Sequence, residues 1–170
     1  MENGVRLSVI IPAHEEAPLI GATRDVLAHS TAWLGDGVEI IVVDDASSDG
    51  TGAIARARGA RVLPVALRQI AAVRNAGAAA ARGDRLLFVD ADTLANPEVV
   101  IALMDAMDRG AVGGGVGVRF IRPLPLHMRI FESVSILLFR LAGVTPGCFL
   151  FCTREAFDAV GGFDESLYVT

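Results

Sequence analysis

The amino-acid sequence predicts an α/β fold, with a mainly parallel β-sheet that is covered by helices on both faces. Short apolar runs alternate with helical patterns along the 170 residues, which indicates repeated right-handed βαβ crossovers. One of these runs, residues 39–43, is continuously apolar after Glu39, as is typical of strands buried on both faces. The length suits one domain, so we expect residues 1–170 to fold as a single unit.

The composition excludes several classes of protein. All 15 basic residues are arginines, and without lysine neither a Walker P-loop nor Schiff-base chemistry can operate. Because 20 acidic residues bring the formal net charge to −5, we expect no nucleic-acid partner. Cys148 and Cys152 make neither a disulfide scaffold nor a four-ligand zinc site, and we expect them to be core residues in a reducing compartment.

The sequence also bears on location. We recognise no signal peptide, and the apolar stretches are shorter than the ~20 residues that cross a bilayer. We therefore expect a cytoplasmic protein, with peripheral contact at the inner face of the membrane as an open alternative.

The first half of the chain is predicted to hold four strands, the first of which ends at Pro12 because proline interrupts strand pairing. A helix is expected from about Pro18, and a second helix is expected to be capped by the side-chain oxygens of residues 47–49. An alanine-rich helix is expected over residues 69–82, ended by Gly83. The four strands are expected at residues 7–11, 39–43, 62–65 and 86–89.

The second half continues the alternation less regularly. Asn96 and Pro97 predict the start of the next helix. A broadly apolar helix over residues 126–141 is expected to pack beneath further C-terminal segments; contact with a membrane interface or a lipid-linked acceptor is the alternative. Where that helix is exposed, we expect self-association. The other elements are expected to be strands at residues 113–120 and 148–152 and a helix at residues 154–160.

Polar clusters follow three of the predicted strands, at residues 12–16, 44–45 and 90–92. Ligands bind at the carboxyl ends of parallel strands, so we expect these clusters to line one crevice. Aspartates at strand ends also occur as plain turn residues, but converging carboxylates repel one another unless a cation is present. On the extended backbone that we expect here, Asp90 and Asp92 point to one side, and their hard oxygens suit Mn²⁺ or Mg²⁺.

Four segments, in order and spacing, resemble the family 2 glycosyltransferases, which have the GT-A fold. They are residues 8–16 (SVIIPAHEE), 42–51 (VVDDASSDGT), 74–77 (RNAG) and 88–92 (FVDAD). The resemblance covers nearly the whole chain and implies a Rossmann-like, GT-A type domain that binds a nucleoside-diphosphate sugar. Two later segments look like landmarks of the family on the acceptor side, at residues 147–149 and 161–165.

The resemblance implies which residues form the nucleoside pocket. Pro12, Ala13 and Glu15 would line it, with Glu15 near the ribose hydroxyls. Asp45 would accept a hydrogen bond from the base. Where the family commonly has Tyr-Asn or Phe-Asn, this chain has His14, to which we assign no catalytic role.

The resemblance also implies how the diphosphate and the metal are held. Arg74, a permanent cation, would approach the diphosphate or the donor sugar; a solvated helix arginine is the alternative. Asp92 would coordinate Mn²⁺ or Mg²⁺ directly, and Asp90 would contact the ribose or reach the metal through water. Ala91 lies between them in the same nucleotide-binding segment. The metal would stabilise the charge that develops on the departing nucleoside diphosphate.

The implied reaction is inverting, metal-dependent transfer of a sugar from a UDP- or GDP-linked donor to an unidentified acceptor, with glycans and lipid-linked groups as candidates. Inversion requires a carboxylate that takes a proton from the acceptor hydroxyl. In the family this base follows the landmark at residues 161–165 by a few residues, so we expect it beyond Thr170. Asp164 and Glu165 are weaker candidates. We therefore expect a chain truncated before its acceptor elements, which binds nucleotide with metal but transfers sugar poorly.

Other classes remain as alternatives. A non-catalytic nucleotide-binding module or scaffold would keep the same donor-binding motifs. A haloacid dehalogenase-like phosphatase also uses Asp-Xaa-Asp after a strand, and a receiver-type signalling domain also has acidic strand ends. Both of these require a lysine, which this chain does not contain.

Overall fold

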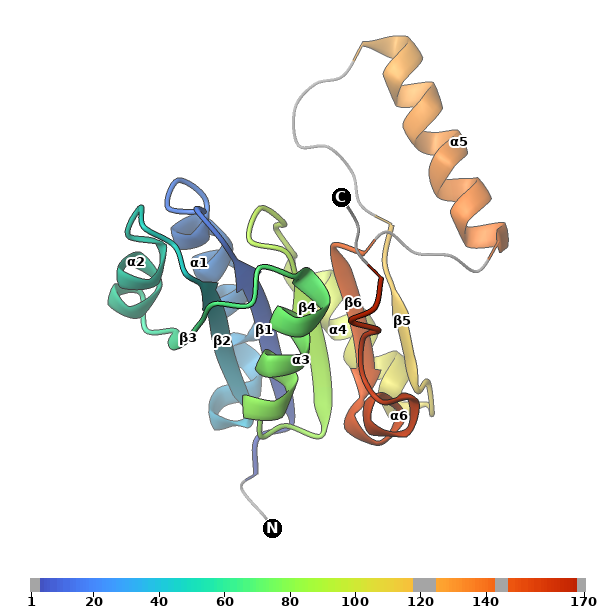
Figure 1. Cartoon of the computed structure of the whole chain (residues 1–170). Helices are drawn as coiled ribbons and strands as arrows, with labels where there is room; N and C mark the ends of the chain where they lie inside the picture. The colour runs from blue at the N-terminus through green and yellow to red at the C-terminus, as the bar shows by residue number, and fades with distance from the viewer. Residues whose placement is uncertain (1–3, 118–124, 143–146, 168–170) are drawn as a thin grey trace.

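The computed structural model describes residues 4–117, 125–142 and 147–167, and its centre is a six-stranded mixed sheet (Figure 1). The strands are β1 Leu7–Ala13, β2 Val38–Asp45, β3 Arg61–Val65, β4 Arg85–Val89, β5 Gly113–Gly115 and β6 Phe149–Thr153. Their spatial order is β3-β2-β1-β4-β6-β5. The first four pair in parallel, whereas β6 runs antiparallel to both β4 and β5. The predicted α/β class with a mainly parallel sheet is confirmed.

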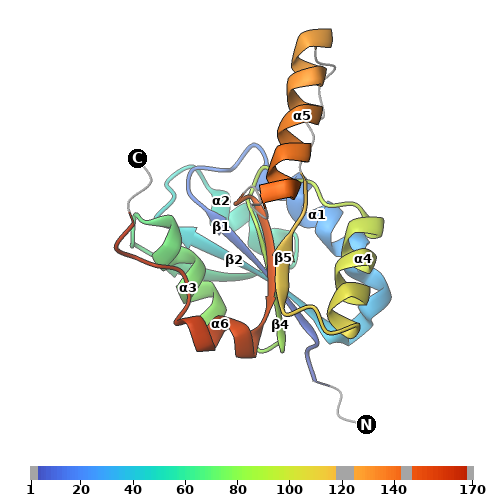
Figure 2. The ribbon, with the colours of Figure 1, turned by 90° about the vertical axis from the view of Figure 1, so that its right-hand side faces the viewer.

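Helices cover both faces of the sheet, as Figure 2 shows edge-on. They are α1 Ile20–Thr31, α2 Thr51–Ala57, α3 Ile70–Ala80, α4 Pro97–Asp108 and α6 Arg154–Val160, with a 3₁₀ segment, η1 Ala32–Gly37, after α1. Helices α1, α2 and α4 pack on one face, and α3 and α6 pack on the other. Successive residues of β1 point to opposite faces of the sheet. Ile11 belongs to the core formed with α1 and α4, and Ile10 belongs to the core formed with α3.

Strand β1 continues two residues beyond the predicted end, through Pro12 to Ala13. Pro12 pairs with Val43 of β2, but β1 pairs with β4 only as far as Ile10. The proline therefore lies beyond the last residue paired with β4, where its missing N–H interrupts no pairing with that neighbour. All seven residues of β1 are buried.

Two helix ends differ in detail from the prediction. Helix α2 begins at Thr51 after Gly50, which has no side chain to cap it, and Asp49 Oδ1 accepts a hydrogen bond from the Thr51 amide at 3.0 Å. Helix α3 ends at Ala80, and Gly83 is pressed against β1 instead. A Cβ at Gly83 would lie 2.8 Å from the amide nitrogen of Ser8.

The predicted strand at residues 113–120 is observed only as β5, and residues 118–120 lie outside the described residues. Strand β6 begins one residue later than predicted, and α6 has the predicted bounds.

Helix α5, Leu126–Ala142, extends away from the sheet in both views (Figures 1 and 2). Three of its apolar side chains are strongly exposed, Phe131 by 67%, Val134 by 48% and Leu138 by 58%. Packing beneath C-terminal segments was expected for this helix, and no such cover is present within the described ranges. None of the helices in those ranges is both long and apolar enough to cross a membrane.

The amino-terminal edge of the sheet is tied together by Glu39, a buried carboxylate on β2. Its Oε1 accepts hydrogen bonds from the Ser8 hydroxyl at 2.7 Å and the Arg82 amide at 2.6 Å, and its Oε2 accepts one from Arg82 Nε at 3.1 Å. Burial alone would raise the pKa of Glu39, but the hydrogen bonds from Arg82 and Ser8 outweigh burial and leave the pKa below its usual value.

Candidate functional site

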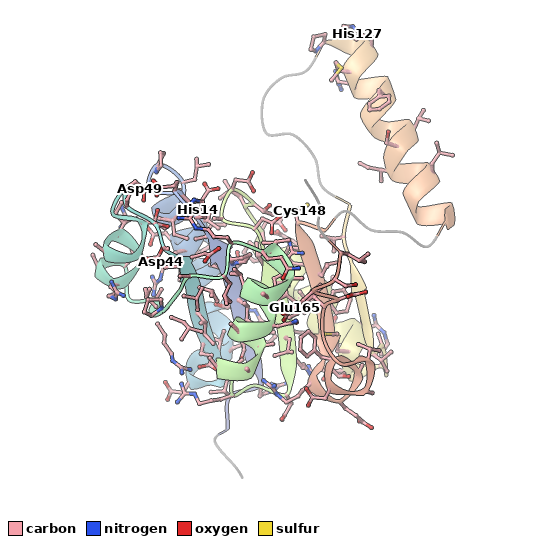
Figure 3. All side chains as sticks on the ribbon, viewed as in Figure 1. His14, Asp44, Asp49, His127, Cys148 and Glu165 are labelled. Atoms are coloured by element: carbon pink, nitrogen blue, oxygen red, sulfur yellow. The ribbon has the colours of Figure 1, made fainter. Side chains whose placement is uncertain are left out.

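The carboxyl ends of β2, β1 and β4 meet at one edge of the sheet, because these strands are parallel neighbours. The three polar clusters, at residues 12–16, 44–45 and 90–92, are therefore brought to this edge. Figure 3 shows His14, Asp49 and Cys148 along this upper rim.

Glu15 joins the loop after β1 to the loop after β2. Its Oε1 accepts hydrogen bonds from the Ser48 amide at 2.7 Å and the Ser48 hydroxyl at 3.1 Å, and its amide donates to Ser47 Oγ at 3.1 Å. The φ of Glu15 is 57°, a left-handed conformation that is uncommon outside glycine and often marks functional loops. Pro12 and Ala13, which were predicted to line the same pocket, are buried as the last residues of β1. The ribose contact stays a prediction.

The oxygens predicted to cap α2 also bind the loop after β1. Asp49 Oδ2 accepts a hydrogen bond from the Ala17 amide at 2.9 Å, and Asp49 Oδ1 accepts one from the Thr51 hydroxyl at 2.5 Å. These hydrogen bonds, first that from Thr51 and then that from Ala17, lower the pKa of Asp49. The two loops are thus joined by side chains that sequence patterns assign to local capping.

Asp45 is buried at the end of β2, and both oxygens of its carboxylate are occupied. They accept hydrogen bonds from the amides of Leu67 at 2.7 Å and Arg68 at 2.8 Å, in the loop between β3 and α3. His14 bridges the same group: Nδ1 lies 2.8 Å from the Asp45 carbonyl oxygen, and Nε2 lies 2.8 Å from Arg68 Nη1. The predicted contact of Asp45 with a base would use the remaining lone pairs of the carboxylate.

Arg74 points from α3 to the end of β4, where its Nη2 donates to Asp90 Oδ1 at 2.8 Å and to the Gly147 carbonyl at 2.9 Å. Its guanidinium carbon lies 5.4 Å from the centre of the Phe163 ring. The side chain is only 12% exposed, and among the described residues its buried Nε has no hydrogen-bond partner. The alternative of a solvated arginine is wrong, and the predicted approach to a diphosphate stays a prediction.

Residues 90–92 form a turn and not the extended segment that we expected. β4 ends at Val89, and the Thr93 amide closes the turn by donating to the Asp90 carbonyl at 3.0 Å. Ala91 is buried, and its carbonyl accepts a hydrogen bond from Thr23 Oγ1 at 2.5 Å. Asp92 is exposed.

The turn nevertheless keeps both aspartates close to the same two neighbouring groups, Glu16 and Cys148. Burial raises the pKa of Glu16, and repulsion from Asp92, Asp49 and Asp90 raises it further. Burial likewise raises the pKa of the Cys148 thiol, with repulsion from Asp90 as the next cause. Glu16 was not among the predicted site residues, although its place in an acidic pair after β1 is a signal for it.

The donor set of this edge suits a divalent ion that shares its ligands with a phosphate. Carboxylate oxygens of Asp90 and Asp92 are the hard ligands that Mn²⁺ and Mg²⁺ prefer. In the described part of the chain, no group of three or more His, Cys, Asp or Glu side chains is placed to hold a metal. The two aspartates therefore fit an ion whose remaining ligands are water and phosphate oxygens.

Asn75, the residue after Arg74, fastens the segment at residues 161–165 to α3. Its Oδ1 accepts a hydrogen bond from the Phe163 amide at 2.9 Å, while its Nδ2 donates to the Phe163 carbonyl at 2.9 Å and to Glu165 Oε1 at 2.8 Å. The carboxylate of Asp164 accepts hydrogen bonds from the Ser166 hydroxyl and amide, which lower the pKa of Asp164.

The family model and the similar sequences both indicate a glycosyltransferase family. The family model for glycosyl transferase family 2 matches residues 8–161. A dolichol-phosphate mannosyltransferase from Mycosarcoma maydis is 33% identical in an alignment of 148 residues that covers 78% of this chain and 50% of that protein. A glucosyl-3-phosphoglycerate synthase from Mycolicibacterium paratuberculosis is 38% identical in an alignment of 102 residues that covers 55% of this chain and 30% of that protein. The chain thus spans half or less of the length of these two relatives.

Solved structures of the same architecture include two enzyme complexes. A mannosyltransferase from Pyrobaculum calidifontis, in complex with GDP-Man and Mn²⁺, has a TM-score of 0.77 at 24% identity, over 95% of this chain and 48% of that chain. A glucosyl-3-phosphoglycerate synthase from Mycobacterium tuberculosis, in complex with Mn²⁺, UDP and glucosyl-3-phosphoglycerate, has a TM-score of 0.66 at 25% identity, over 89% of this chain and 58% of that chain. These likenesses confirm the predicted GT-A type fold.

Proposed function

Because this chain belongs to glycosyl transferase family 2, we propose that it binds the nucleoside diphosphate of a nucleotide sugar at the ends of β1, β2 and β4. It would form the donor-binding part of a glycosyltransferase. The convergence of Glu15, Asp45, Arg74 and the Asp90–Asp92 turn on one edge carries this proposal. UDP- and GDP-linked sugars are the first donors to test, since relatives of this fold bind GDP-Man and UDP.

The proposed roles follow from how each side chain is held. Asp45 is fixed by two amides and would accept a hydrogen bond from the base with its free lone pairs. Glu15 is fixed beside Ser48 and would bind the ribose hydroxyls. Asp92 is exposed and, among the described residues, forms no ion pair, so it is the proposed direct ligand of Mn²⁺ or Mg²⁺, with Asp90 beside it. When bound, such an ion supplies stabilisation of the charge on the departing diphosphate.

The finer features of the reaction belong to the same proposal. We expect transfer with inversion, a base contributed beyond Thr170, and a glycan or lipid-linked acceptor. A cytoplasmic location, with or without contact at the membrane surface, also stays a prediction.

Titration calorimetry of the 170-residue chain with UDP and with GDP, each with and without Mn²⁺, tests nucleotide binding. One of the two nucleotides should bind, and its affinity should fall when the metal is removed by chelation. Asp92→Asn should weaken the metal-dependent binding by at least about tenfold, since it removes a charged ligand. Asp105→Asn, which changes an exposed aspartate on α4, should bind as the unaltered chain does. Binding of neither nucleotide in the presence of Mn²⁺ would refute the proposal.

Turnover separates a transferase from a binding module or scaffold. Release of nucleoside diphosphate from the donor sugar is measured for the 170-residue chain and for the chain extended at its C-terminus. Little turnover by the first and recovered turnover by the second supports a transferase whose base lies beyond Thr170. Rapid turnover by the 170-residue chain would contradict the expected position of the base.

A further inference from the structure

Arg74 already supplies a cation to the carboxylates of the candidate metal site. Its guanidinium contacts Asp90 at 2.8 Å and is held from two other sides, by the Gly147 carbonyl at 2.9 Å and by the Phe163 ring. With 12% of the side chain exposed, this charge is only partly screened by water. Asp90 is therefore neutralised by a fixed partner before any ligand arrives.

Two features make the site poor at holding a metal ion alone. The described residues offer fewer than three side chains that could ligate one ion together. One of the two aspartates is also paired with Arg74, whose positive charge repels a divalent ion placed at the same carboxylate. A diphosphate reverses both effects, since its oxygens complete the coordination shell and its negative charge attracts a guanidinium.

We propose that Arg74 makes metal binding depend on the diphosphate: it opposes a bare divalent ion at Asp90 and Asp92, and it favours the ion together with the diphosphate. This inference rests on the proposed function and assigns Arg74 as a positioning residue that couples the two ligands. Such coupling is reciprocal, so the diphosphate should raise the affinity for the metal by the same factor as the metal raises the affinity for the diphosphate.

The position of Arg74 supports the coupling. Both hydrogen bonds of Arg74, to Asp90 and to Gly147, come from Nη2, so the guanidinium has further N–H donors that these two partners do not use. Asp90 is the carboxylate that Arg74 pairs with, so removing the charge of Arg74 should leave Asp90 free to attract a metal ion.

The experiment measures the dissociation constant of Mn²⁺ by electron paramagnetic resonance, without nucleotide and with saturating UDP or GDP, whichever the chain binds. Arg74→Gln keeps amide donors for Asp90 and Gly147 but removes the charge, and Arg74→Lys keeps the charge. Arg85→Met is the matched control, because Arg85 is also paired with an aspartate, Asp108, but lies at the opposite end of β4.

In the unaltered chain the nucleotide should tighten Mn²⁺ binding by at least about tenfold. Arg74→Gln should bind bare Mn²⁺ roughly three- to tenfold more tightly, and the effect of the nucleotide should shrink by a similar or larger factor. Arg74→Lys should have dissociation constants for Mn²⁺ close to those of the unaltered chain, both without and with nucleotide. Arg85→Met should also match the unaltered chain. Thermal unfolding of every variant verifies that the fold is kept.

Two results separate the inference from the function on which it rests. If the unaltered chain binds nucleotide with Mn²⁺, but Arg74→Gln leaves the bare-ion affinity unchanged or weaker, the inference is overturned and the proposed function stands. If the unaltered chain binds no nucleotide with Mn²⁺, both are overturned. Should Arg74→Gln fail to fold, Arg74→Lys decides: a large gain in bare Mn²⁺ affinity with the charge retained would overturn the role of the charge.

Discussion

His14 illustrates how a single ring organises two loops. Its Nδ1 faces a carbonyl oxygen, which only accepts hydrogen bonds, and its Nε2 faces the Arg68 guanidinium, which only donates them. The neutral ring must therefore carry its proton on Nδ1. Long-range proton–nitrogen NMR spectra should show the Nδ1–H tautomer for His14. A spectrum of the Nε2–H tautomer would contradict the observed arrangement of Asp45 and Arg68 around the ring.

Gly77 is required by the close approach of α3 to the sheet. A Cβ at this position would lie 2.4 Å from Ile10 Cγ2 and 2.8 Å from Val43 Cγ2, and both side chains are fully buried. Gly77→Ala should therefore lower the free energy of unfolding by about 1–3 kcal/mol, despite the better helix propensity of alanine.

Urea denaturation checks this expectation for Gly77. Gly4→Ala is the control, because no heavy atom lies within 4 Å of a Cβ built at Gly4. Equal denaturation midpoints for the two variants would show that β1 and β2 yield to the added methyl group at little cost.

At the scale of residues, motifs in the sequence predict which side chains reach the edge of the sheet but not what they touch there. Arg74 was expected near a phosphate, and its contact with Asp90 depends on how α3 packs on the sheet. Asn75 lies in the same motif, but no role was predicted for it, because its partner Phe163 is 88 positions away in the sequence. Local patterns carry no information on such a pairing.

Among the elements, β2 is anchored by the hydrogen bonds of Glu39. Because the folded protein holds the pKa of Glu39 below 4.5, the stability that this carboxylate contributes is present above that pH and is lost as the pH falls through the folded-state pKa. Glu39→Gln should lower the free energy of unfolding by about 1–3 kcal/mol near neutral pH, since it leaves buried donors without a charged acceptor.

Chemical denaturation at a series of pH values tests the contribution of Glu39. The difference between Glu39→Gln and the unaltered chain should shrink below the usual pKa of the carboxyl, and Asp36→Asn, at an exposed position in η1, should show no such trend. A difference that stays constant down to acid pH would argue against a charged Glu39 in the folded state.

A helix or strand can be predicted where its sequence signals are local, and not where it depends on contacts with distant segments. Helix α4 begins as predicted, since Asn96 accepts a hydrogen bond from the Val99 amide and Pro97 follows it. Of the oxygens expected to cap α2, Asp49 Oδ1 binds the Thr51 amide, while Ser47 Oγ and Asp49 Oδ2 bind the neighbouring loop. The antiparallel direction of β6 was not foreseen, since strand order is set by packing over the whole sheet.

For the whole molecule, the exposed face of α5 has the clearest consequence in solution. Met128, Phe131, Val134 and Leu138 present apolar surface at helical spacing. We expect the 170-residue chain to self-associate as its concentration rises, and Phe131→Glu combined with Leu138→Glu should shift it towards the monomer.

Light scattering over a range of concentrations measures this association. Glutamate at two exposed positions of α4, Ile101 and Ala102, serves as the control and should leave the association unchanged. A monomer at every concentration for the unaltered chain would contradict the expectation.

The fold class was predictable from the alternation of apolar strands and helical segments, because burial on both faces of a parallel sheet leaves a strong pattern in the sequence. The placement of α5 was not predictable, because its apolar face indicates that something packs on it but does not identify the packing partner. That residues 1–170 fold as a single domain stays a prediction.

The two ends of the central sheet hold separate groups of interacting residues. Glu39 holds strands together at one end, while Asp90 and Arg74 lie at the other, and they share no contact. Substitutions at such independent places usually combine without interference. The edge that we propose to bind the nucleotide can therefore diverge among descendants of this chain, or be redesigned in the laboratory, while the opposite edge preserves the scaffold.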